Sequence, residues 1–498
     1  MPDGTARGTA RDPHEVIHPN HDPSAVRVPD TDDLAGVGPL GVTVVVHTDE
    51  DEDVDFQPPK GRLRATVSLG VSQSIDNTEG GVSRTFFPQI TVAFGVGDAA
   101  LGLLNAIGFF ARMLFGPIWA IAADRFGRKR ILLLVTGAWG LWTIATGFAQ
   151  TWTQLLILYT IALIGTVASE PILNGLLGSL YHSSERGKAF GTVRGVSSAI
   201  GIVLTPLLGQ FGDNPDGWRY AMFVMGGLSI FSGLLILLFV HEPKHVSHDD
   251  AKELKSEAGI FRLSDAAKLF KIPTLALMAP MLLFVTSLIL FGFIGTYWAR
   301  DLGYGVTNAS YLYTVMTIGM TISAFLGGFL GDLFAHRFGD KGRIMLFQLY
   351  ALLFAASTYV MVGLSSVFDP DVAPGTGNAV TNTPSVAYYV IVFITGLIFS
   401  WGFSGCVLPM VSRVCPKQLS ATSFAVLFSL VQGGITAIYS LTAGAVSQAI
   451  GNLQLTLLLF VSIPYVLNAI YWTLFYRFYP RDADLQAERS RLIEQGRF

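Results

Sequence analysis

The sequence predicts an all-α membrane protein with 12 transmembrane helices in two pseudo-symmetric six-helix bundles. Of its 498 residues, 51% are hydrophobic and only 14% are charged, whereas soluble proteins carry roughly 25% charged residues. Long apolar runs recur at regular intervals from residue 63, and each can cross roughly 30 Å of hydrocarbon as a helix. A short motif with an acidic residue and a basic cluster occurs once in each half, which indicates a duplicated membrane domain.

Five parts follow one another along the chain. Residues 1–62 are polar and rich in Pro and Asp, and they include the acidic run Asp49–Asp55. Such a composition cannot bury a core, so we expect a disordered cytoplasmic segment. An N-terminal bundle (63–240), a cytoplasmic linker (241–274), a C-terminal bundle (275–478) and a cytoplasmic tail (479–498) follow. The predicted spans are 63–92, 99–122, 131–149, 153–178, 188–210, 218–240, 275–299, 307–331, 343–364, 386–409, 419–445 and 453–477.

Lys and Arg are distributed unevenly between the loops. If both termini are cytoplasmic, the inner loops, the linker and the tail hold most of the loop cations, and the outer loops keep only Arg219 and Arg300. This asymmetry is the positive-inside pattern. It predicts a multi-pass protein of the cytoplasmic membrane with both termini inside the cell.

The repeated motif lies where a span leaves the membrane. Gly116–Arg130 reads GPIWAIAADRFGRKR, and Gly328–Arg343 reads GFLGDLFAHRFGDKGR. In both copies a Gly and an Asp precede the basic residues. Gly127 stands where a tight turn favours a residue without a Cβ atom.

These motifs and the six-plus-six layout resemble the major facilitator superfamily. Gly217–Arg219, at the start of the sixth span, and His241–Lys244, at its end, also match, although Ala120 stands where that family usually has Gly. The resemblance covers about residues 63–478. It implies alternating access, in which two bundles rock about a site near the bilayer midplane. It also implies a conformational latch made of Asp124, Arg125, Gly127, Arg128, Lys129 and Asp332.

Six ionisable residues fall inside the predicted spans, all in the N-terminal half. A charge at mid-helix costs roughly 2.5–3.5 kcal/mol on an insertion scale, so we expect these groups to pair, to be protonated or to face water. Because Asp76 and Arg112 both lie near the middle of their helices, we predict that they form an ion pair. Arg194 is close enough to its helix end to snorkel to the surface. The six are Asp76, Glu79, Arg84, Arg112, Glu170 and Arg194.

The three carboxyl groups are candidates for proton coupling, because a carboxyl that changes partners between two conformations can carry a proton. A static salt-bridge network is the alternative. Gln73, Asn77 and Arg84 share one stripe of the first span at 100° per residue. The C-terminal half has no acidic residue deep in the membrane. The predicted proton-coupling residues are Asp76, Glu79 and Glu170, and the predicted charge-partner and substrate residues are Arg84, Arg112, Gln73, Asn77, Trp401 and Gln432.

The first-span Asp, the fourth-span Glu and the start of the linker resemble Spinster-like lipid transporters and the neighbouring organic-anion symporters. Those branches usually carry an Arg one or two turns before the fourth-span acid. Here the stretch Tyr159–Ser169 contains no Arg. Either Arg112 substitutes from the second span, or the coupling differs.

Neither metal binding nor a disulfide framework is expected. Two groups of histidines have a spacing found in helical metal sites, but no Cys joins either group. The cysteines predict one buried thiol, Cys406, and one loop thiol, Cys415. The histidines are His14, His18 and His21 in one group, and His241, His245 and His248 in the other.

The predicted function is proton-coupled secondary transport of small amphiphilic organic molecules or lipids by alternating access, with export favoured. A proton-coupled uptake symporter for an organic anion and a uniporter are the alternatives. The chain has no HExxH, GxSxG or P-loop motif, so we predict no enzyme. A receptor or scaffold that docks through the acidic N-terminal segment is a further class. The expected partners are a small-molecule substrate, protons and the lipid bilayer, with no nucleic acid and no cofactor, and we expect a monomer.

Overall fold

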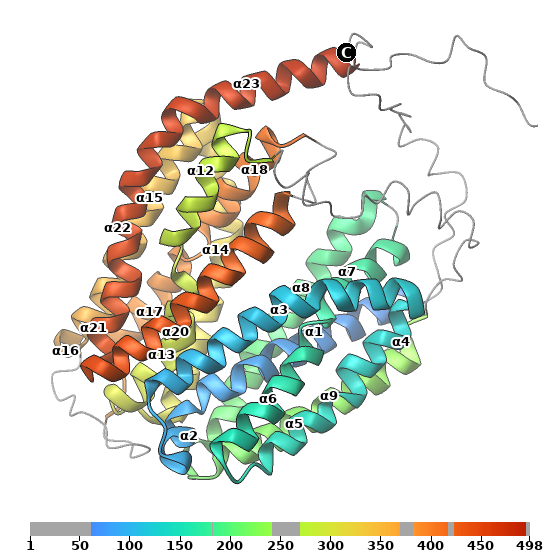
Figure 1. Cartoon of the computed structure of the whole chain (residues 1–498), viewed down its shortest axis with the longest axis vertical. Helices are drawn as coiled ribbons and strands as arrows, with labels where there is room; N and C mark the ends of the chain where they lie inside the picture. The colour runs from blue at the N-terminus through green and yellow to red at the C-terminus, as the bar shows by residue number, and fades with distance from the viewer. Residues whose placement is uncertain (1–60, 182, 242–268, 369–381, 417–422, 495–498) are drawn as a thin grey trace, which may run out of the picture. The chain divides into compact units, whose positions relative to one another are not determined.

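The computed structural model describes residues 61–181, 183–241, 269–368, 382–416 and 423–494, and these are almost entirely helical (Figure 1). Residues 1–60 of the predicted disordered segment, the histidines of the two predicted groups other than His241, and most of the predicted linker lie outside the described residues. The domain limits therefore stay predictions.

The N-terminal half consists of helices that follow the first six predicted spans in order. They are α1 (Arg62–Thr85), α2 (Phe87–Phe94), α3 (Asp98–Phe126), α4 (Arg128–Leu132), η3 (Leu133–Ala138), α5 (Gly140–Gly147), α6 (Trp152–Thr166), α7 (Ser169–Leu180), α8 (Ser183–Gly209), η4 (Gln210–Asp213) and α9 (Gly217–Phe239).

The C-terminal half follows the other six predicted spans. Its elements are α12 (Pro273–Met281), η5 (Leu282–Phe284), α13 (Ser287–Thr296), η6 (Tyr297–Asp301), α14 (Gly305–Phe338), α15 (Asp340–Thr358), η7 (Tyr359–Gly363), α16 (Ser365–Phe368), α17 (Val386–Ile398), η8 (Phe403–Val407), α18 (Leu408–Val414), η10 (Ala425–Gln432), α20 (Gly433–Ile450), α21 (Leu453–Leu457), η11 (Leu458–Ser462), α22 (Ile463–Tyr471), η12 (Trp472–Leu474) and α23 (Phe475–Glu494).

Eleven helical stretches among the described residues are long and apolar enough to cross a membrane. They correspond to the second to twelfth predicted spans. The first predicted span is α1, which is 24 residues long but carries Asp76, Glu79 and Arg84. Its polarity explains why a hydropathy criterion passes over it. The predicted fold class of 12 membrane helices is confirmed.

The fourth span is broken in its middle, and this break sets the position of a charged residue. α6 ends at Thr166 and α7 begins at Ser169. Pro171 causes the break, because it lacks the N–H that would bond to the carbonyl four residues earlier. Glu170 consequently lies in the first turn of α7.

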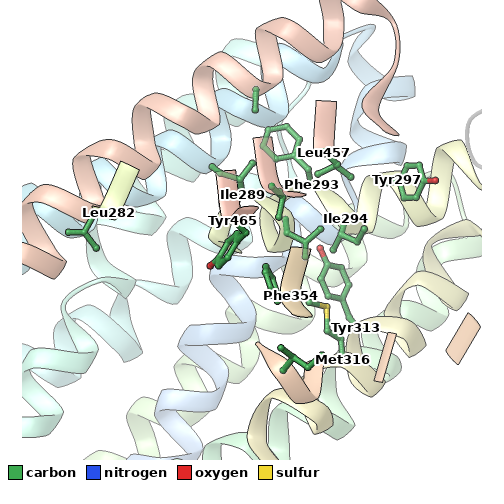
Figure 2. Close-up of a cluster of buried hydrophobic side chains, with 14 of the residues drawn as sticks. Leu282, Ile289, Phe293, Ile294, Tyr297, Tyr313, Met316, Phe354, Leu457 and Tyr465 are labelled. Atoms are coloured by element: carbon green, nitrogen blue, oxygen red, sulfur yellow. The ribbon is translucent and has the colours of Figure 1, made fainter. Parts of the chain in front are cut away.

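Buried apolar side chains form two clusters. The larger one includes residues from both halves, and Figure 2 shows a part from the C-terminal half that includes Phe293, Tyr313 and Tyr465. The smaller cluster lies in the N-terminal half and includes Leu132 and Leu176. Cys406 is buried as predicted. Cys415, predicted as a loop thiol, follows α18 but is also buried, and burial raises the pKa of its thiol.

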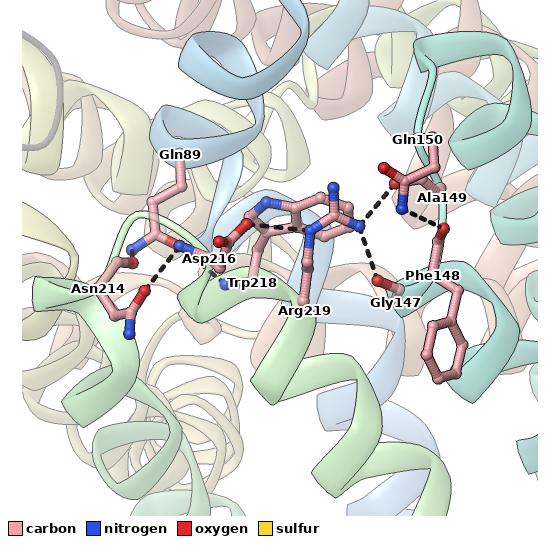
Figure 3. Close-up of polar contacts among 9 residues, drawn as sticks. All are labelled: Gln89, Gly147, Phe148, Ala149, Gln150, Asn214, Asp216, Trp218 and Arg219. Carbon is pink, nitrogen blue, oxygen red and sulfur yellow. Dashed lines mark hydrogen bonds and ion pairs between the residues drawn. The ribbon is translucent and has the colours of Figure 1, made fainter.

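Polar contacts tie the helix ends of the N-terminal half together at one end (Figure 3). Arg219 at the start of α9 donates to the carbonyl oxygens of Gly147 (2.8 Å), the last residue of α5, and of Ala149 (2.6 Å), just after it. The Gln89 amide of α2 donates to the Asn214 carbonyl at 2.8 Å and accepts from the Trp218 N–H at 2.9 Å. The sequence motif Gly217–Arg219 is thus a structural tie between helix ends.

The two halves pack against each other near Asp98, at the start of α3. There α3 and α20 lie side by side (Figure 1). A Cβ atom on Gly102 would lie 2.4 Å from the Ser440 carbonyl oxygen, and one on Gly444 would lie 2.6 Å from that of Asp98. Such a close approach requires glycine on both helices. We call this end of the helices the Asp98 end.

Candidate functional site

Two adjoining cavities lie among the membrane helices. The ionic cavity, of about 340 Å³, is lined by Asp76, Arg112 and Glu170 among others. The hydroxyl cavity, of about 230 Å³, is lined largely by α1 and α8 of the N-terminal half and by α13 and α14 of the C-terminal half. Asn77, Arg84 and Phe291 line both cavities, so the two adjoin at these side chains. Their combined size suits a small-molecule site.

Arg112 and Glu170 form an ion pair across the ionic cavity. The Arg112 Nη1 donates to Glu170 Oε2 at 3.2 Å, from α3 to α7. The predicted pair between Asp76 and Arg112 is therefore wrong. The break before Pro171 brings Glu170 to the start of α7, where its carboxylate reaches Arg112. The alternative that Arg112 substitutes for a missing fourth-span Arg agrees with this geometry.

Asp76 lines the same cavity but is buried, with 6% of its surface exposed. Thr136 Oγ1 donates to its Oδ2 at 3.5 Å, and its Oδ1 has no hydrogen-bond partner. The hydroxyls of Ser72 and Ser169 are close enough to interact electrostatically with Asp76, but neither reaches hydrogen-bond geometry. A buried carboxyl with so few partners carries much of the desolvation cost of its charge.

Arg84 is the cation at the junction of the two cavities. Its Nη2 donates to the Gly80 carbonyl on its own helix at 3.2 Å, and its guanidinium carbon lies 6.0 Å from the ring centre of Phe291 on α13. Among the described residues no carboxylate forms an ion pair with it, in contrast to Arg112. Most of its N–H donors are thus available to a ligand.

Glu79 points away from both cavities. Its two carboxylate oxygens accept hydrogen bonds from the hydroxyls of Thr143 on α5 and Ser229 on α9. It is buried, with 5% of its surface exposed, and borders a separate small void within the N-terminal half. Glu79 therefore lines neither of the two cavities, whereas Asp76 and Glu170, with which it was grouped by sequence, line the ionic cavity.

The sequence profile of the Major Facilitator Superfamily matches residues 69–440, which is most of the chain. The chain belongs to this superfamily.

Several relatives within the superfamily are transporters. The probable galactarate/D-glucarate transporter GudP of Bacillus subtilis is 25% identical over 355 residues, covering 67% of this chain and 72% of that protein. The sphingosine-1-phosphate transporter SPNS2 of Danio rerio is 31% identical over 164 residues, covering 32% of this chain and 32% of that protein. These relatives agree with the prediction of a transporter and not an enzyme.

Solved structures of superfamily members show the same fold. A bacterial homologue of the human lysosomal transporter Spinster, in an inward-facing and occupied conformation, superposes with a TM-score of 0.65 at 18% identity, covering 86% of this chain and 99% of that chain. A D-xylose–proton symporter gives a TM-score of 0.62 at 14% identity, covering 84% of this chain and 98% of that chain. The predicted resemblance to the Spinster-like neighbourhood of the superfamily is confirmed.

The two copies of the superfamily motif have matching contacts in the structure. In the first, Arg128 donates to Asp124 at 3.1 Å and to the Gly175 carbonyl of α7 at 2.7 Å. In the second, Arg343 donates to Asp332 at 2.8 Å and to the Gly405 carbonyl of η8 at 2.7 Å. Each copy therefore joins the end of one helix to the backbone of another within its own half.

The remaining motif residues have local contacts. Lys129 Nζ donates to the Leu237 carbonyl of α9 at 3.0 Å. The Arg125 guanidinium carbon lies 5.5 Å from the ring centre of Phe126. Gly127 has φ of 96°, a conformation that favours glycine, between α3 and α4.

The other predicted substrate residues divide into two groups. Gln73 lines the ionic cavity, and Asn77 lines both cavities. Trp401 and Gln432 do not line either cavity. Trp401 packs beside Gly327 of α14, with a buried indole N–H that has no hydrogen-bond partner. The structure therefore does not bring these two C-terminal residues to Arg84.

Sequence reasoning missed an ionic contact between the halves at the Asp98 end. Arg300 of η6 donates to both carboxylate oxygens of Asp98 on α3, and Ser447 of α20 donates to the same carboxylate at 2.6 Å. Asp98 is 6% exposed. Both charged residues lie one position outside predicted spans (99–122 and 275–299), and opposite charges at these two positions are the signal by which the sequence could have indicated the contact.

Proposed function

We propose that this protein is a proton-coupled secondary transporter of a small organic anion that works by alternating access in the cytoplasmic membrane. The proposal of an anionic substrate rests on the surroundings of Arg84. This residue lines both cavities without a carboxylate partner among the described residues, whereas Arg112 is paired with Glu170. A free guanidinium binds a carboxylate or a phosphate through two parallel hydrogen bonds. Two relatives are named for the transport of galactarate/D-glucarate and of sphingosine-1-phosphate, and these substrates carry carboxylate or phosphate groups.

Asp76 supports the proton coupling. It is buried beside the ionic cavity, and its Oδ1 has no hydrogen-bond partner. Uptake of a proton from cavity water would remove a buried charge, so protonation would be linked to how α1 packs against η3 and α7. Ionisable residues in membrane helices are usually functional. The Arg112–Glu170 pair beside it would respond to the same change in charge.

We also propose an orientation, which follows from the distribution of Lys and Arg. With both termini in the cytoplasm, the Asp98 end faces outward. The contacts between Asp98 and Arg300 then close the outer side, so this conformation faces the cytoplasm. In the same scheme the Asp124 and Asp332 motifs lie at the inner surface and act as the latch that is remade when the bundles rock.

A second candidate substrate is an exported amphiphile with an anionic head. The relative named as a sphingosine-1-phosphate transporter favours it. The apolar side chains of Leu104, Phe109 and Leu163 line one part of the ionic cavity and would accept an alkyl chain. Arg84 would hold the phosphate in this case.

Transport by the purified protein in proteoliposomes tests these proposals. A panel of labelled sugar acids and sphingosine-1-phosphate is offered with and without an imposed pH gradient. We expect Arg84→Gln to reduce transport of a sugar acid by about 10- to 100-fold, because hydrogen bonds to a charged group contribute about 1.5–3 kcal/mol. Arg194→Gln is the matched control, since Arg194 lies on α8 and lines neither cavity.

Three results would decide against parts of the proposal. If Arg84→Gln transports a sugar acid at the wild-type rate, Arg84 does not bind the anion. If the rate of transport does not depend on the pH gradient, the protein is a uniporter and is not coupled to protons. Transport of sphingosine-1-phosphate, with no sugar acid accepted, would select the amphiphile.

A further inference from the structure

We propose that the substrate is a polyhydroxylated monocarboxylate of the aldonate class, with its carboxylate on Arg84 and its hydroxyl groups in the hydroxyl cavity. This inference rests on the anion transport proposed above and names the class of anion.

The first argument is the state of the hydroxyls on α8. Ser197, Ser198 and Thr205 line the hydroxyl cavity, and their side chains have no hydrogen-bond partner among the described residues. Ser197 is only 8% exposed. In contrast, Thr192 on the same helix bonds to the carbonyl of Lys188 at 2.8 Å. Helical Ser and Thr commonly bond back to a carbonyl four residues earlier, so three unpaired hydroxyls facing one cavity indicate a polar ligand.

The second argument is the complementary wall on α1. Thr78 donates to the carbonyl of Ser74 at 2.8 Å, and Thr85 donates to that of Gly81 at 3.2 Å. Their hydroxyl hydrogens are therefore used, but oxygen lone pairs remain for a ligand that donates. Asn77 adds an amide that both donates and accepts. A chain of hydroxyl groups satisfies both walls, whereas an alkyl chain would leave these polar groups desolvated and unpaired, which costs free energy.

The third argument concerns the number of carboxylates. Arg84 is the cation lining these cavities that has no acidic partner among the described residues. In the ionic cavity, the charge of Arg112 is balanced by Glu170, and Asp76 adds a further acidic group. With the first carboxylate on Arg84 and the chain in the hydroxyl cavity, a second carboxylate at the other end would meet no further cation among the residues that line that cavity, so its charge would be desolvated without a partner. The site thus favours one carboxylate.

Competition with labelled gluconate in a counterflow assay tests this inference. Unlabelled gluconate, hexanoate and galactarate serve as competitors, because all have six carbon atoms. Hexanoate lacks the hydroxyls, and galactarate carries a second carboxylate. We expect gluconate to compete best, with both others at least about 10-fold weaker, as the loss of one or two hydrogen bonds or an unpaired second carboxylate would give.

Variants locate the hydroxyl contacts. Ser198→Ala and Thr205→Val should each weaken gluconate competition by about 3- to 10-fold, the effect of one hydrogen bond, and leave hexanoate unchanged. The ratio of gluconate to hexanoate is internal to each protein, so it does not depend on expression or folding yield. Thr192→Val is the matched control, because its hydroxyl is bonded to the backbone and lines neither cavity.

The outcomes separate this inference from the proposed function. Equal competition by hexanoate and gluconate, or unchanged ratios in both variants, would overturn the polyhydroxylated substrate and leave the anion transporter intact. Stronger competition by galactarate would overturn the single carboxylate. Transport of another carboxylate but not gluconate would overturn the aldonate class alone. If the protein transports no carboxylate at all, the proposed function is wrong as well.

Discussion

Arg112 on α3 and Glu170 on α7 form an ion pair whose side chains are both more than half exposed, 63% and 53%. Such exposed pairs contribute only about 0–1 kcal/mol to stability, because water screens both charges. The pair therefore contributes little to the stability of the fold. Its effect is on the cavity, where it neutralises one cation and leaves Arg84 as the group that attracts an anion.

Glu170→Gln tests this view of the pair. The variant frees Arg112 in the cavity while changing stability by less than about 1 kcal/mol. We expect a normal melting temperature, a changed pH dependence of transport, and a relative gain in affinity for galactarate over gluconate, because a second cation becomes available. Thermal unfolding and counterflow competition measure these effects. An unchanged pH profile and an unchanged preference would mean that Glu170 does not influence the site.

Asp76→Asn addresses the coupling to protons. The amide keeps the size of the carboxyl but does not ionise, so it cannot bind and release a transported proton. We expect counterflow, which needs only alternating access, to continue, while accumulation driven by a pH gradient is lost. Proteoliposomes with and without the gradient separate the two activities. Gradient-driven accumulation at the wild-type level in Asp76→Asn would exclude this residue as the proton carrier.

Glu79 has a different predicted role, because its carboxylate is held by Thr143 and Ser229 inside the N-terminal half. Glu79→Ala leaves two buried hydroxyls without their acceptor, and each such loss costs about 1–3 kcal/mol. We expect a clearly lower melting temperature, with pH-driven transport retained in the protein that folds. Glu79→Gln, which keeps one acceptor oxygen, should be milder. Normal stability combined with lost coupling would instead make Glu79 the proton carrier.

The membrane spans were predictable because hydropathy and length depend on local sequence. The residues of the candidate site could be predicted only in part. Asp76, Arg84, Arg112 and Glu170 stood out as charges in apolar runs, and the structure brings all four to the cavities. The partner of Arg112 was mispredicted because it depends on a helix break at Pro171 and on the rotation of α7 relative to α3, which one sequence does not specify.

The uncharged Ser and Thr side chains of the site were even harder to predict from the sequence. The hydroxyls that hold Glu79 come from Thr143 and Ser229, and the unpaired hydroxyls of the hydroxyl cavity come from α8. Ser and Thr are common in membrane helices and usually satisfy their own backbone, so their identity alone did not mark them. Asp98 and Arg300 are 202 residues apart in sequence. Their contact exists only because the halves pack at the Asp98 end.

Arg300→Met tests whether that contact controls which conformation is populated. The variant keeps an apolar stem but leaves Asp98 buried with only the Ser447 hydroxyl as a partner. Breaking one member of a buried pair costs about 3–5 kcal/mol, and because this pair joins the halves, the cost is borne by the conformation closed at the Asp98 end. Even the lower figure changes a conformational equilibrium by about 100-fold.

Cysteine cross-linking measures that equilibrium directly. The native Cys406 and Cys415 are both buried, and cysteines introduced as Gly97→Cys and Gln448→Cys lie in contact across the halves. We expect Arg300→Met to slow cross-linking between them strongly, and Ser447→Ala, which removes one hydrogen bond to Asp98, to slow it less. If Arg300→Met cross-links at the original rate, then glycine packing of α3 against α20 is sufficient to hold this end closed, and the ion pair does not control this equilibrium.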